Sequence, residues 1–168
     1  MSEQEGIDQS TKDLVWKWLM DMGYTVERNS FPGLSWAIKG TAEAAPGVAI
    51  GVAEKIGQTD RIYVQYALQI AGVYREELAR LPDSERREFV WDIRFRLIGM
   101  DADFQGADDP LIAVNFLEII YKEALNRTTF RTAIRQIVKS YIALDWMLQR
   151  KFSQALPGGE ALPKDLVN

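Results

Sequence analysis

Two runs of alternating apolar side chains, joined by a short polar loop, occupy residues 48–70. In the second run, 61–70, every other residue is large and apolar, while Gln65 and Gln69 fall on the opposite face. A repeat of two residues predicts a β-strand with one buried face. Residues 57–60 have turn composition, so the two runs predict an antiparallel hairpin.

The segments around this hairpin predict an α+β protein. Helices are predicted where apolar side chains recur every three to four residues, over 10–22, 73–80, 84–98 and 128–152. Strands are predicted where they alternate, over 24–29, 34–39, 48–56 and 61–70. Residues 112–124 fit either a helix or a strand buried on both faces, and their β-branched and aromatic content favours the strand.

The predicted order of elements is α-β-β-β-β-α-α-β-α. Short connections favour an antiparallel sheet of about five strands, with the helices packed on one face. Residues 10–152 then form a single α+β domain. The polar residues 1–9 and the Pro- and Gly-rich residues 153–168 are expected to be flexible tails.

Histidine and cysteine are both absent from the 168 residues. Zinc sites built on these residues, thiol nucleophiles and triads that need an imidazole base are therefore excluded. The glycines form no phosphate-binding motif. We expect a protein that is not an enzyme and that binds no metal ion or cofactor.

The formal net charge is −4, which does not steer a chain toward nucleic acid. A nucleic-acid partner is therefore not expected. Residues 1–10 lack the apolar core of a signal peptide, so a cytoplasmic location is expected.

Four short segments, with the predicted order of elements, carry a family resemblance. They are Trp16-Lys17-Trp18-Leu19, Gly23-Tyr24, Ile119-Ile120-Tyr121, and Leu125-Asn126-Arg127 followed by Phe130. Over about residues 10–150 the chain resembles the type III secretion chaperone-like fold, including its YbjN-like group. The resemblance implies a small, acidic, dimeric protein, and the secretion chaperones of this family bind extended segments of client proteins. It transfers no catalytic residue.

The helix predicted over 84–98 is apolar on two sides. One row contains Phe89, Val90, Ile93 and Leu97, and a nearly opposite row contains Trp91, Phe95 and Ile98. Such a helix is buried between layers or lies at an interface. The sequence does not choose which row faces the core. We expect one of them to face a partner, and we expect a homodimer through this surface.

Two further surfaces are candidates for binding. Trp16 and Met20 lie four residues apart, on the side of the first helix away from its core row. Arg131 and Arg135, with Trp146 in the same flank of the last helix, fit an anionic partner or a membrane surface. A solvated face paired with local carboxylates explains this flank equally simply, and we favour it over membrane contact.

Two carboxylates, Glu54 and Asp145, fall on otherwise apolar rows. A buried acid needs a partner, because its desolvation alone is costly. We favour structural ion pairs or water-exposed ends of elements. An acid–base pair in an apolar cavity is the alternative.

The function expected from these features is that of a non-enzymatic interaction protein. It would be a chaperone-like dimer that binds an apolar or extended segment of a partner protein. The alternative is a binder of a lipid or another small apolar ligand between sheet and helices. An enclosed cavity lined by Trp36, Tyr66 or Trp146 would favour that alternative.

Overall fold

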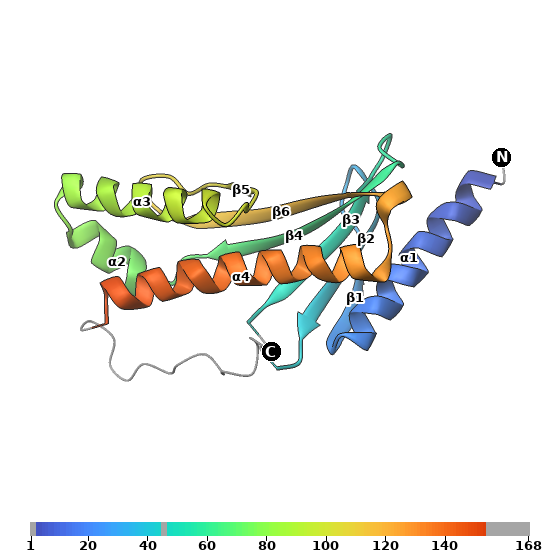
Figure 1. Cartoon of the computed structure of the whole chain (residues 1–168), viewed down its shortest axis with the longest axis horizontal. Coiled ribbons are helices and arrows are strands. Elements are labelled where there is room, and N and C mark those ends of the chain that lie inside the picture. The colour runs from blue at the N-terminus through green and yellow to red at the C-terminus, as the bar shows by residue number, and fades with distance from the viewer. Residues whose placement is uncertain (1–2, 45–46, 154–168) are drawn as a thin grey trace. The chain divides into compact units, whose positions relative to one another are not determined.

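The computed structural model describes residues 3–44 and 47–153 (Figure 1). It confirms the α+β class and the order of the predicted elements. Within the described residues the strands form one six-stranded antiparallel sheet, in the order β1-β2-β3-β4-β6-β5. The elements are α1 (Glu3–Asp21), β1 (Tyr24–Asn29), β2 (Leu34–Ala42), β3 (Ala49–Lys55), β4 (Arg61–Gln69), α2 (Gly72–Arg80), α3 (Asp83–Ile98), β5 (Phe104–Gln105), β6 (Ala113–Tyr121), the 3-10 helix η1 (Lys122–Ala124) and α4 (Arg127–Lys151).

The packing divides the chain into two compact units. The first contains the residues up to Tyr66 together with Ile119–Ile134, and the second contains Ala67–Glu118 together with the described residues from Arg135 onward. β4, β6 and α4 each contribute residues to both units. The segment 10–152, expected as one domain, is therefore divided between these units, and each is described by itself.

In the first unit, antiparallel pairing brings the apolar side chains of successive strands into line. Ile38 lies opposite Val52, and Val52 lies opposite Val64. All three are almost completely buried, because alternate side chains of each strand point to the same face. α1 covers this face at Gly40, where an added Cβ would lie 3.3 Å from the side chain of Leu19. A glycine there allows the helix to approach the strand closely.

The start of α4 also belongs to the first unit and is fixed by its cap. The Asn126 Oδ1 atom accepts hydrogen bonds from the backbone N–H groups of Thr128 and Thr129, at 2.9 and 3.0 Å. This is the arrangement of an N-cap residue. Phe130, in the first turn of α4, packs on Trp18 of α1 with ring centroids 5.6 Å apart. The cap therefore sets the direction in which α4 leaves η1.

The second unit settles which row of α3 faces the core. Phe89 packs edge-on against Phe152 just after α4, with ring centroids 6.0 Å apart. Phe89, Val90, Ile93 and Leu97 are all buried. Tyr74 of α2 also lies against Phe152, at 6.2 Å. Residues 72–98 thus form a helical pair that packs on the end of α4 through aromatic contacts.

Three features of the fold differ from the sequence predictions. α1 begins at Glu3, so residues 3–9, expected in a flexible tail, are helical. β2 continues to Ala42 through Gly40, which serves helix packing and does not end the strand. The strand favoured over residues 112–124 is confirmed as β6, and the chain continues as η1 from Lys122. β5 was not predicted, because two residues show no alternation. Most of the expected C-terminal tail, from residue 154 onward, lies outside the described residues.

Candidate functional site

The outer row of α3 is an exposed apolar surface, which we call the α3 patch. Its residues Trp91, Phe95 and Ile98 are 53%, 65% and 60% exposed. The Trp91 and Phe95 rings pack on each other with centroids 5.7 Å apart. Large apolar side chains gathered on one helix face are typical of interaction surfaces. The patch is therefore the second of the two rows that the sequence left open.

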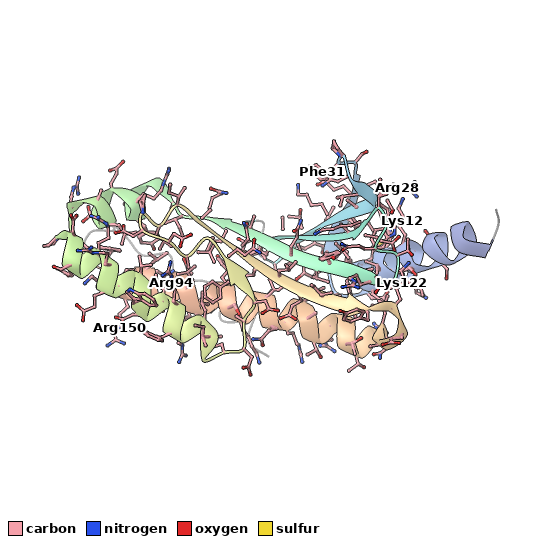
Figure 2. All side chains as sticks on the ribbon, turned by 90° about the horizontal axis from the view of Figure 1, so that it is seen from above. Lys12, Arg28, Phe31, Arg94, Lys122 and Arg150 are labelled. Atoms are coloured by element: carbon pink, nitrogen blue, oxygen red, sulfur yellow. The ribbon has the colours of Figure 1, made fainter. Side chains whose placement is uncertain are left out.

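Arg94 connects the α3 patch to the loop after β5. Its guanidinium lies 4.9 Å from the centre of the Trp91 ring, within range of a cation–π interaction. The same side chain donates hydrogen bonds to the Ala107 carbonyl, at 2.6 Å, and to Asp108, at 2.5 Å. Arg86 forms an ion pair with Asp109 of the same loop, with 2.6 Å between Arg86 Nε and Asp109 Oδ1. Arg94 thus links the loop after β5 to α3 and to the exposed Trp91 ring (Figure 2 labels Arg94).

The α3 patch has opposite charges along its two sides. At 100° per residue, Glu88 and Asp92 lie on one side of the row, whereas Arg87 and Arg94 lie on the other. Arg87 and Glu88 are adjacent in sequence, so they flank the row at nearly the same height. Both are exposed.

Trp16 and Met20 are brought beside the edge strand β1. The Trp16 Nε1–H group donates to the Met20 sulfur at 3.1 Å, and Met20 is 58% exposed. The Arg28 guanidinium of β1 lies 5.7 Å from the centre of the Trp16 ring. Phe31, in the loop that follows β1, is also exposed (Figure 2). We call Trp16, Met20 and Arg28 the β1-edge cluster.

The basic flank of α4 lies at the surface, where Arg131 and Arg135 are four residues apart on one face of the helix. Arg131 belongs to the first unit, whereas Arg135 and Trp146 belong to the second, and all three are exposed. Two of the residues named for a lipid cavity lie in the core of the first unit. Trp36 and Tyr66 are buried in the first unit, and the Tyr66 hydroxyl donates to the Gly47 carbonyl at 3.5 Å.

Glu54 is completely buried in the first unit and forms an ion pair. Lys122 Nζ lies 2.5 Å from Glu54 Oε2, and the lysine side chain is 15% exposed. Trp36 stands opposite Glu54 in the β2–β3 register, and its Nε1 atom is buried without a hydrogen-bond partner among the described residues. The predicted structural ion pair is thus present, and it joins β3 to η1.

Asp145 lies in the second unit, where it is half-buried. Burial raises the pKa of its carboxyl group, and a 2.6 Å hydrogen bond from Gln149 opposes that rise. Burial raises the pKa values of Tyr74 and Tyr141, and the charge of Asp145 raises them further. Glu54 and Asp145 belong to different units, and each has its own partners. The pair expected as an acid–base alternative is therefore not supported.

Replacing Asp145 by asparagine tests this burial. A raised folded-state pKa means that Asp145 binds its proton more tightly when folded, so its contribution to stability falls as pH rises from its ordinary value through the raised one. We expect Asp145→Asn to raise the urea midpoint at pH 7 more than at pH 3.5. Glu76→Gln, an exposed change on α2, serves as the control. An equal effect of Asp145→Asn at both pH values would contradict the prediction.

No helix in the described part of the chain is long and apolar enough to cross a membrane. Residues 3–44 and 47–153 also contain no group of three or more acidic, histidine or cysteine side chains placed to hold a metal ion.

The fold has a counterpart among solved structures. The chain is similar to the crystal structure of an uncharacterized protein from Methanothermobacter thermautotrophicus, with a TM-score of 0.78 and 21% identity, over 84% of this chain and 98% of the other. This likeness shows the fold alone. No curated protein matches the chain. A family model described as "Uncharacterized conserved protein (DUF2299)" matches residues 11–148. The chain therefore belongs to this family of uncharacterized conserved proteins.

Proposed function

We propose that this protein is a non-enzymatic interaction protein, a chaperone-like homodimer that binds an apolar or extended segment of a partner protein. The observation that carries the proposal is the β1-edge cluster, in which an apolar pair and a cation lie beside a strand at the edge of the sheet. The resemblance to the type III secretion chaperone-like fold supports the same class of function.

The backbone of β1 can accept another strand. Among the described strands, β1 is paired only with β2. The Glu43 N–H group donates to the Gly23 carbonyl at 3.1 Å, and the register continues this pairing along β1. Hydrogen-bonded and outward-facing residues alternate in an antiparallel pair, so the backbone groups of Tyr24, Val26 and Arg28 turn outward. An extended segment can bind these groups as an added strand.

The side chains at the edge specify the character of that segment. Every second side chain of an added strand would point toward the side where α1 presents Trp16 and Met20. Methionine and tryptophan adapt to apolar partners of differing shape. Arg28 is exposed and Lys12 is half-buried on α1, whereas Glu27 is already paired with Lys39 at 3.2 Å. Arg28 lies on the same side as Trp16, so we propose an extended segment that carries apolar side chains and one acidic side chain on its face toward α1.

Binding of a synthetic peptide tests the proposed function. A fluorescent eight-residue peptide with three valines and one glutamate on one face of the strand and threonine on the other should bind, and its counterpart with lysine in place of glutamate should bind more weakly. Trp16→Ala combined with Met20→Ala should weaken binding at least about tenfold, since anchor side chains commonly contribute more than 1 kcal/mol. Arg28→Glu should reverse the preference for the acidic peptide. Fluorescence polarisation measures each affinity.

Two controls make the experiment decisive. Arg150→Glu, an exposed charge reversal on α4, should leave peptide binding unchanged. N-methylation of alternate peptide bonds in the probe should abolish binding while the protein stays intact, because strand addition uses those N–H groups. Equal binding of the acidic and basic peptides, or of the methylated probe, would refute the proposed site.

A further inference from the structure

We propose that a second copy of this chain covers the α3 patch, with the two α3 helices parallel and related by a two-fold axis that runs along them. The inference deepens the proposed function, on which its dimer rests, by naming the surface and the register. It stands on the exposure of Trp91, Phe95 and Ile98 and on the charges beside them.

The α3 patch is suited to a permanent contact. Trp91 and Phe95 are already packed on each other, and Arg94 holds the tryptophan ring through bonds to the loop after β5. Burying ordered side chains loses little conformational entropy, so more of the apolar gain remains as affinity. Aromatic residues of this kind are enriched among the side chains that dominate protein interfaces.

The charges beside the α3 patch identify a second copy as the occupant. In a two-fold pair with parallel helices, the acidic side of one α3 meets the basic side of the other. Glu88 of each copy then lies beside Arg87 of the other, at nearly the same height. Asp92 likewise approaches the side that carries Arg94. Each favourable contact occurs twice because of the symmetry.

An antiparallel pair would lose this complementarity. Turning one helix around brings the side that carries Glu88 and Asp92 against the same side of the other copy. Like charges placed together at an interface oppose association. The arrangement of Arg87 and Glu88 on opposite sides of one apolar row therefore selects the parallel pair.

Sedimentation of the full chain tests whether a second copy is the occupant. We expect the wild type to be a dimer at micromolar concentration, and we expect Phe95→Ser to raise the dimer dissociation constant at least about thirtyfold. Leu14→Ser, on the exposed side of α1, is the matched control and should leave the dimer intact. A wild type that remains monomeric at 100 µM would overturn the inference and would leave the α3 patch to a different protein.

Charge exchange and cross-linking test the register. Arg87→Glu alone and Glu88→Arg alone should each weaken the dimer about tenfold, and the double variant should recover wild-type association. The chain has no cysteine, so Ser84→Cys provides a single thiol at the start of the row. In a parallel pair the two thiols face each other, and a short bis-maleimide should join the copies. A double variant no better than the single ones, or absence of this cross-link in a dimer, would overturn the parallel register.

The two proposals can fail separately. If Phe95→Ser is monomeric and still binds the acidic peptide, the peptide site at β1 is independent of the dimer. If the peptide fails to bind while the Arg87 and Glu88 exchange restores the dimer, the proposed partner segment is wrong and the dimer stands.

Discussion

The Lys122→Met variant is expected to lose about 3–5 kcal/mol of unfolding free energy. The substitution removes the cation 2.5 Å from Glu54 Oε2 and keeps the carboxylate in the core of the first unit, where its side chain is 0% exposed. A buried charge deprived of its counter-charge is poorly solvated in the apolar core. Urea unfolding, monitored by circular dichroism, measures the loss.

A double variant separates the ion pair from the packing of the side chains. Glu54→Met combined with Lys122→Met removes both charges while keeping side chains of similar length, and we expect its stability to return to within about 1–2 kcal/mol of wild type. Lys39→Met is the matched control, because it removes a surface lysine paired with Glu27 and should cost less than about 1 kcal/mol. Equal losses for Lys122→Met and Lys39→Met would contradict this account of the buried pair.

Gly106→Ala is expected to cost about 3 kcal/mol, because two penalties coincide at this glycine. Its φ of +83° lies in the left-handed region, which disfavours residues that carry a Cβ. An added Cβ would also lie 2.8 Å from the carbonyl oxygen of Ala113, which is backbone of β6 and cannot rotate away. The neighbouring Ala107, held by Arg94, limits movement of the loop in the other direction.

Gly57→Ala isolates the first penalty from the second. Gly57 has a similar φ of +79°, but no atom lies within 4 Å of a Cβ added there. We expect this variant to lose only about 1–2 kcal/mol, the usual cost of a left-handed conformation. Urea midpoints of the two variants provide the comparison. Equal losses of unfolding free energy would contradict the second penalty, because the backbone at Ala113 would then move to accommodate the added Cβ without loss of stability.

Alternation and helical periodicity predicted most of the fold. β4 was predicted from its own residues because one of its faces is uniformly apolar, and the structure places Ile62 and Val64 in the core. The strand over residues 113–121 was distinguished from a helix by its β-branched and aromatic content. Both elements carry their signal locally, which is why one sequence was sufficient.

Features that depend on distant parts of the chain were not predictable. Both rows of α3 are comparably apolar, and only packing on Phe152 shows which of them is buried. Glu54 was recognised as needing a partner, but Lys122 follows a later strand and reaches it only through the pairing of β4 with β6. The position of Trp16 and Met20 beside β1 likewise depends on how α1 crosses the sheet. The periodicity of a segment shows which face of a helix or strand a side chain lies on, but it does not show which distant residue contacts that side chain.

The two edges of the sheet differ in what they offer to another chain. β1 presents six residues, whereas β5 presents two and is followed by a loop that Arg86 and Arg94 fasten to α3. Growth of a filament by strand addition requires a usable strand at both edges of every copy. β5 offers an added strand far less backbone than β1, so we expect strand addition to favour the β1 edge and repeated addition through β5 to be weak.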